Sequence, residues 1–153
     1  YRDKTVVETL RGLDPPTEVA RTDATAPPAA GSDAPAVTAP PAGPVRLRAA
    51  SLRGIDHRAS GTASIIRQPD GALVVGLEDI DIEPGPDYRV YVVPGDTEST
   101  DDGAVELDTL RGNQGTQFYD VPAGVGVDQG TWTVLVWCKR FAVPIAAAVP
   151  VAA

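Results

Sequence analysis

Short runs of β-branched and apolar residues recur from residue 45 to the end of the chain, separated by turn-forming residues at intervals of roughly ten positions. Strands of a sandwich or barrel have this length and spacing. From residue 45 onward, no stretch long enough for a helix shows helical periodicity. The pattern predicts an all-β fold, an antiparallel and jelly-roll-like β-sandwich, with strands at 45–52, 61–67, 72–82, 88–93, 104–110, 116–121, 131–137 and 142–149.

Two connections between these runs carry turn chemistry of their own. The sequence QPDG at 68–71 places Pro, Asp and Gly where a β-turn prefers them, which predicts a tight turn. The sequence RGNQG at 111–115 is rich in Gly, but it lacks the Lys and the following helix of a phosphate-binding loop. We expect a tight hairpin there.

The first 44 residues differ in composition from the rest. Helical periodicity near 5–13 predicts a helical turn or two that ends before Pro15 and Pro16. Residues 22–44 contain six Pro, eight Ala and no aromatic residue, so they bury too little apolar surface to offset their ordering entropy. We therefore expect a juxtamembrane-like segment at 1–21, a disordered but semi-rigid Ala/Pro-rich tether at 22–44, and one domain at 45–153.

The balance of charge argues against two classes of partner. The 153-residue chain carries 21 acidic against 13 basic side chains, whereas binding to nucleic acid depends on clustered Lys and Arg. Anionic membrane surfaces repel such a chain as well. No run reaches the ~18 apolar residues of a transmembrane helix. Because the sequence starts at Tyr1 rather than Met, we expect a removed upstream segment, and membrane contact only through such an anchor.

Cys138 is the single cysteine, which excludes an internal disulfide. It ends the run at 131–138, and neither face of that run is polar, so we expect a central strand that is buried on both sides. Lys139 and Arg140 follow in a predicted turn. Two interpretations stay open: a thiol beside two cations can have a lowered pKa and react as the thiolate, or a buried cysteine can serve as a small core residue.

His57 is the single histidine and lies in a predicted turn between the first two strands. It is a candidate ligand of a metal or haem, a candidate base for Cys138, or a solvated side chain. One His and no Met exclude a blue-copper site, which takes two His, a Cys and usually a Met. A zinc site would need carboxylates in addition to His57 and Cys138.

Carboxylates are frequent in two places. Asp79, Asp81 and Glu83 alternate with isoleucines and so share one face of a predicted strand, and the loop at 94–103 contains four more acidic residues. Such clusters can bind a hard cation such as calcium, but EF-hand spacing is absent. A solvated strand face and a solvated loop account for the same pattern, and we expect no metal site.

Five stretches, in order along the chain, resemble one known family. They are HRASGTA at 57–63, GPDYRVYV at 85–92, VELDTLRG at 105–112, GTQFYDVP at 115–122 and VWCKRFAV at 136–143. From about residue 51 to the C-terminus the chain is similar to the DM-thirteen domain. This small electron-transfer domain often stands beside DOMON domains in animal cell-surface proteins, and it occurs alone in exported bacterial proteins.

The resemblance implies a β-sandwich and a characteristic cysteine, which falls on Cys138. In the family that cysteine is proposed to act in redox chemistry, as a free thiol or as a ligand of a prosthetic group such as haem. The first hypothesis is therefore an exported or cell-surface electron-transfer module with a protein redox partner. Cys138 would be its reactive or cofactor-binding residue, His57 would be the partner of Cys138, and Trp132 and Trp137 would shape the pocket.

The second hypothesis is a non-catalytic binding or adhesion module outside the cell. Loops 94–103 and 112–115 would then present a surface to a partner or glycan, and Cys138 would be structural. No GxSxG elbow or other recognisable catalytic set is present, so the sequence does not predict an enzyme. Both hypotheses place the domain on the outside of the cell, tethered to the membrane by the segment expected upstream of residue 1.

Overall fold

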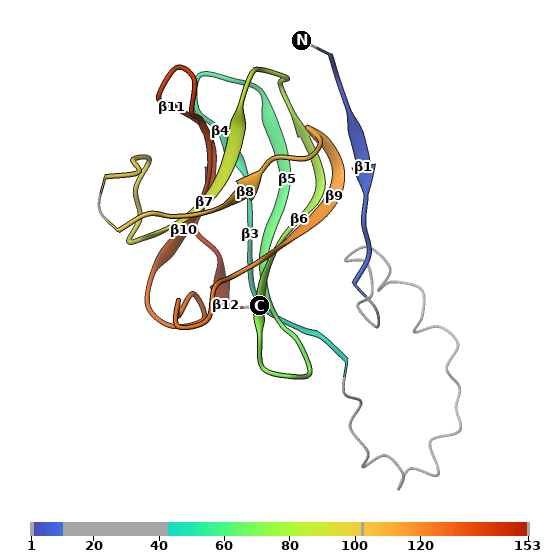
Figure 1. Cartoon of the computed structure of the whole chain (residues 1–153), viewed down its shortest axis with the longest axis vertical. Helices are drawn as coiled ribbons and strands as arrows, with labels where there is room; N and C mark the ends of the chain where they lie inside the picture. Colours follow the sequence, from blue (N-terminus) through green and yellow to red (C-terminus); the bar gives the residue numbers. More distant parts are fainter. Residues whose placement is uncertain (1, 11–42, 102, 153) are drawn as a thin grey trace, which may run out of the picture.

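The computed structural model describes residues 2–10, 43–101 and 103–152, and all of its regular structure in these ranges is β (Figure 1). This confirms the predicted all-β class. The strands are β1 Thr5–Val7, β3 Val45–Ser51, β4 Arg53–Gly54, β5 Ala59–Arg67, β6 Leu73–Ile82, β7 Tyr88–Pro94, β8 Val105–Thr109, β9 Gln114–Asp120, β10 Trp132–Cys138, β11 Val143–Ala148 and β12 Val151–Ala152.

The strands form two sheets that pack face to face as a β-sandwich (Figure 1). Sheet 1 has the order β1-β9-β6-β5-β3-β12, and sheet 2 has the order β4-β11-β10-β7-β8. Neighbouring strands are antiparallel, except that β1 runs parallel to β9. The chain changes sheets several times, for example from β6 to β7 and from β9 to β10, so residues from distant parts of the sequence meet at the ends of the sandwich.

All eight predicted runs are strands, with boundaries that differ by at most a few residues. The turn at 68–71 joins β5 to β6, where the Gly71 amide donates to the Gln68 carbonyl oxygen at 2.8 Å and the Ala72 amide donates to the Asp70 carboxylate at 2.9 Å. Gly71 has φ +94°, which favours glycine over residues with a side chain. The local sequence therefore determines this hairpin.

The main core lies between the sheets and draws on both. Ile65 and Leu77 of sheet 1 face Val90, Val134 and Val136 of sheet 2, and all five side chains are buried. A second, smaller cluster covers the outer face of sheet 2, and it contains Leu135 with Val93 and Ala147. Strand β10 thus lies in the centre of its sheet and is buried on both faces, as its sequence predicts.

The predicted hairpin at 111–115 is wrong. Strands β8 and β9 lie in different sheets, and the chain crosses between them here. The crossing backbone is held by Gln117, whose side-chain amide donates to the Gly112 carbonyl oxygen at 2.7 Å and whose side-chain oxygen accepts from the Arg111 amide at 2.9 Å. Glycine-rich sequence marks a change of direction, but it does not say which sheet the next strand joins.

The helical turns predicted near residues 5–13 are contradicted at Thr5–Val7, which form strand β1. β1 pairs with β9 in the register Thr5 to Gln114 and Val7 to Thr116. A three-residue strand carries almost no helical or strand preference of its own, so the free edge of β9 decides its conformation. The predicted tether at 22–44 lies almost wholly outside the described residues. No helix in the part of the chain that the structure describes is long and apolar enough to span a bilayer.

Candidate functional site

Cys138 is the last residue of β10, where that strand lies between β7 and β11. Its pairing partners are Tyr88 on β7 and Val143 on β11. The residue is 1% exposed and packs in the main core. Its thiol donates to the carbonyl oxygen of Pro86 at 3.2 Å. The loop that precedes β7 therefore helps to hold the sulfur in place.

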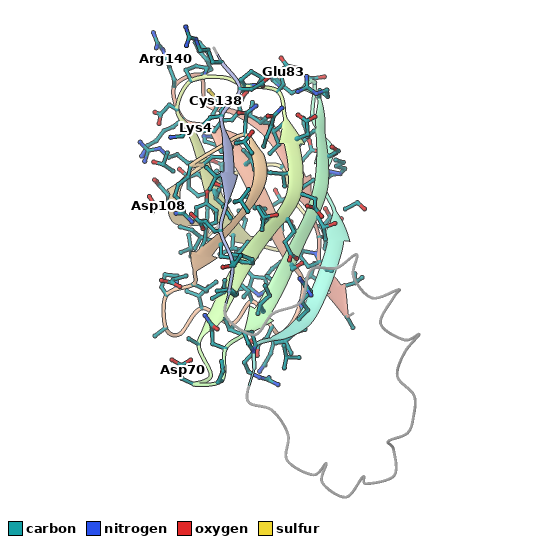
Figure 2. All side chains as sticks on the ribbon, turned by 90° about the vertical axis from the view of Figure 1, so that its right-hand side faces the viewer. Lys4, Asp70, Glu83, Asp108, Cys138 and Arg140 are labelled. Atoms are coloured by element: carbon teal, nitrogen blue, oxygen red, sulfur yellow. The ribbon has the colours of Figure 1, made fainter. Side chains whose placement is uncertain are left out.

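A cavity of ≈ 120 Å³ lies against Cys138 at this end of the sandwich, and His57 lines the same cavity. Figure 2 shows Cys138 and Glu83 at one end of the molecule and Asp70 at the other. The further lining residues are Glu83, Pro84, Gly85, Pro86, Tyr88, Phe141, Val143 and Ile145. The structure thus brings together the two residues that sequence reasoning singled out, although 81 positions separate them along the chain.

His57 lies in the tight loop between β4 and β5. Its Nδ1 atom is 2.8 Å from the Ile55 carbonyl oxygen, so in the neutral ring Nδ1 carries the proton and Nε2 is left as an acceptor. A Cβ atom at Gly54 would lie 1.9 Å from the His57 carbonyl oxygen, so only glycine lets the loop fold back this closely. The loop therefore fixes both the position and the tautomer of the histidine.

Tyr88 forms a wall of the cavity beside Cys138 and is 7% exposed. Burial raises the pKa of Tyr88, and the charges of Cys138 and Glu83 add to the rise. The phenol therefore stays protonated at neutral pH. Gly85 lies directly against the ring, because a Cβ atom there would be 2.3 Å from the Tyr88 hydroxyl oxygen. Sequence analysis missed both residues, since only strand pairing places Tyr88 opposite Cys138.

A comparison with known protein families adds an independent finding to this geometry. The family model described as Electron transfer DM13 matches residues 51–149, which is more than half of the chain. The chain belongs to this family. Searches among curated proteins and solved structures found no match. The resemblance inferred from the five sequence stretches is thereby confirmed, and the match includes both His57 and Cys138.

The tryptophans of this DM13 domain do not shape the cavity, and that expectation is wrong. Neither residue lines it. Trp132 stands at the other end of β10, where its indole nitrogen donates to the Gln129 carbonyl oxygen at 3.0 Å. Trp137 lies on the outer face of sheet 2 with the smaller cluster. Strand alternation turns Trp137 away from the face that Cys138 occupies, and five residues of extended chain lie between Trp132 and Cys138.

The two cations that follow Cys138 are engaged with other groups. The Lys139 ammonium lies 3.3 Å from the Glu106 carboxylate, and the Arg140 guanidinium lies 5.8 Å from the centre of the Phe141 ring. Neither residue lines the cavity, whereas Phe141, which is 61% exposed, does. The mouth of the cavity is therefore marked by an exposed aromatic ring rather than by a positive charge.

A haem does not fit the cavity. Pockets that enclose drug-sized ligands measure roughly 300–1,000 Å³, and a volume of ≈ 120 Å³ admits only a few atoms. Cys138 is also almost fully buried, so a ring system outside the cavity does not reach its sulfur. The residues that line the cavity suit a small molecule or a modification of the thiol itself.

Two of the acidic residues considered for calcium, Asp81 and Glu83, are engaged by Arg58. Asp79 lies at a bulge of β6 with φ +53° and is exposed, whereas Ile80 and Ile82 on either side of Asp81 are buried, as the predicted alternation requires. Asp81 pairs with Arg58 at 2.9 Å. Glu83 lies further along, accepting from the Arg58 amide at 3.1 Å. Within the described ranges, no three side chains of the types His, Cys, Asp and Glu come together as a metal site.

Proposed function

We propose that this DM13 domain is an exported or cell-surface electron-transfer module in which Cys138 is the redox-active group and His57 accepts its proton. One observation carries the proposal: the single cysteine and the single histidine of the chain line the same small cavity. Family membership supports the electron-transfer role. The Ala/Pro-rich composition of residues 22–44 supports an exposed location, which protease digestion of intact cells checks.

The size of the cavity favours two-electron chemistry of the thiol with a small oxidant. Proton transfer from Sγ to Nε2 of His57 would give a thiolate, which is the reactive form. The thiolate would attack one oxygen of a peroxide, forming an S–O bond as the O–O bond breaks, so that sulfur is oxidised to a sulfenic acid and an alkoxide or hydroxide leaves with the electron pair. Two thiols of a partner protein would then reduce the sulfenic acid, releasing water and forming the partner's disulfide.

The experiment measures how fast iodoacetamide and hydrogen peroxide modify Cys138 in the folded protein from pH 5 to 10, read by mass spectrometry. We expect reaction in the native state, and a His57→Ala variant that reacts at least tenfold more slowly near neutral pH, because the proton acceptor is lost. The denatured protein sets the rate of a free thiol. Arg58→Ala is the matched control, since Arg58 neighbours His57 but does not line the cavity.

A non-catalytic binding module is the second candidate function, and the burial of the thiol favours it. Cys138 is 1% exposed, packs in the main core and donates to the Pro86 carbonyl oxygen, as a structural cysteine does. The same experiment separates the two functions. A thiol that both reagents leave unmodified until the domain unfolds supports the binding module and contradicts the redox proposal.

A further inference from the structure

The outer edge of β9 is shaped to receive a strand. A Cβ atom at Gly115 would lie 2.0 Å from the carbonyl oxygen of Val6, and one at Gly112 would lie 2.6 Å from Cγ2 of the same residue. Gly115 also has φ +101°, a conformation that other residues rarely adopt. Both glycines therefore leave room for the backbone and side chain of β1. A residue with a side chain at position 112 or 115 would block the docking of this strand.

Side chains of the domain hold both ends of the segment from Asp3 to Glu8. At one end Asn113 accepts from the Lys4 amide at 2.6 Å and donates to the Asp3 carboxylate at 2.9 Å. At the other end the Glu8 carboxylate accepts from the Arg111 guanidinium at 2.7 and 3.0 Å. These contacts form a receptor for one extended peptide. The strand pairs with β9 through its backbone, and polar side chains bind it at both ends.

The backbone pairing itself is short: three residues of β1 pair with β9, and one further backbone bond flanks them at each end. The Gln114 amide donates to the Lys4 carbonyl oxygen at 3.1 Å, and the Glu8 amide donates to the Thr116 carbonyl oxygen at 2.8 Å. The Phe118 amide adds one more hydrogen bond, which it donates to the Glu8 carboxylate at 3.0 Å. Every recognised group lies within residues 3–8, and none of these bonds requires that strand and receptor belong to the same chain.

We propose that the β9 edge also accepts residues 3–8 of a second copy of this chain, giving a strand-exchanged dimer. The connection from residue 9 to residue 44 can span roughly 110 Å when extended at ~3.1 Å per residue, more than enough to reach a neighbouring molecule. Addition of an extended segment to a sheet edge is a common mode of recognition between chains. The complementary sequence is already present in every copy.

Exchange brings the partner's residues next to the proposed redox site. Arg2 and Lys4 line a second cavity, of ≈ 200 Å³, whose wall of Pro84, Gly85 and Tyr88 is shared with the cavity at Cys138. In the dimer, each copy would supply these two cations to the other. Because a tethered strand has an effective concentration in the millimolar range, the protein is monomeric when dilute and dimerises as its concentration approaches that value.

A charge exchange at the Glu8–Arg111 pair tests the proposal in the full chain. Glu8→Arg places two cations together within one copy, and Arg111→Glu places two anions together, so each variant alone releases its strand. When the two variants are mixed, each strand meets a complementary receptor on the other copy. We expect light scattering to show a doubled mass for the equimolar mixture at about 0.1 mM and the mass of a monomer for either variant alone.

The double variant Glu8→Arg with Arg111→Glu is the matched control, because it restores the pair within one copy and should be monomeric when dilute. A mixture that remains monomeric up to about 1 mM, beside a folded double variant, overturns the proposal. If Arg111→Glu alone does not fold, the two variants are expressed together with different tags, and failure to copurify carries the same meaning. The redox proposal is independent of this result, since Cys138 is measured separately.

Discussion

Tyr88 is one of three residues that line both cavities, and its position depends on a glycine. Its side chain belongs to the wall shared by the cavity at Cys138 and the one lined by Lys4, and Gly85 lies against it closely enough that a Cβ atom would be 2.6 Å from the ring carbon Cζ. The ring is buried and cannot move into solvent without exposing the core. A single methyl group at position 85 therefore tests how tightly the wall is packed.

We expect Gly85→Ala to lower the free energy of unfolding by about 1–3 kcal/mol, the usual cost of overpacking, because the added methyl group would clash with the buried Tyr88 ring. The displaced ring should also open the cavity, so that iodoacetamide modifies Cys138 faster. Urea unfolding and alkylation measure the two effects. Gly126→Ala is the control, because its Cβ atom would meet nothing closer than 3.9 Å. Equal behaviour of the two variants would show that Tyr88 does not seal the cavity.

At the scale of elements, the ion pair between Glu8 and Arg111 holds the end of β1 against β9. Burial alone would raise the pKa of Glu8, but hydrogen bonds from the Arg111 side chain and the Phe118 amide, with the charge of Arg111, outweigh it and leave the pKa below its ordinary value of 4.5. Asp108 faces the same guanidinium at 3.7 Å. The docked strand therefore favours the ionised form of Glu8.

Because docking lowers the pKa of Glu8, its contribution to docking is fully present above pH 4.5 and is lost as the pH falls through the lowered pKa. We expect the Gln114 amide, which donates to the Lys4 carbonyl oxygen, to lose protection from hydrogen exchange in that range before the core does. In Glu8→Gln the same amide should exchange faster at neutral pH and respond less to acid. An amide protected equally in both proteins at every pH would contradict this role.

At the scale of the whole molecule, one partly buried ion pair joins three strands of sheet 1. The Glu78 carboxylate of β6 is 3% exposed, and it accepts from the Arg46 guanidinium of β3 and from the Ser64 hydroxyl of β5 at 2.8 Å. A domain of this size usually unfolds as one cooperative unit, so the loss of a local bond appears in global stability. Breaking one side of such a pair leaves a buried charge without its counterion.

We expect Arg46→Ala to lower the free energy of unfolding by about 3–5 kcal/mol, because Glu78 then keeps only the hydroxyl of Ser64. Arg58→Ala removes an exposed pair with Asp81 and should cost no more than about 1 kcal/mol. Chemical denaturation of both variants measures the difference. Similar costs for the two would mean that Glu78 finds water or another donor when Arg46 is absent.

The sequence alone determined the strands and much of the family assignment. Period-two alternation, β-branched residues and turn chemistry act locally, so they predict β5, β6 and the turn at 68–71 without knowledge of the fold. The burial of β10 on both faces followed from the same pattern. His57 and Cys138 stood out as candidates because each is the only residue of its kind.

Tertiary structure decided which of these pieces meet. The crossover at 111–115, the parallel docking of β1 and the wall that Tyr88 forms beside Cys138 all depend on contacts between residues far apart in the chain. Local preference is nearly neutral at such places, so the free edge of β9 and the space left by Gly112 and Gly115 select the conformation. The cavity is lined by the loops before β5 and β7 together with β10 and β11, which only the tertiary structure brings together.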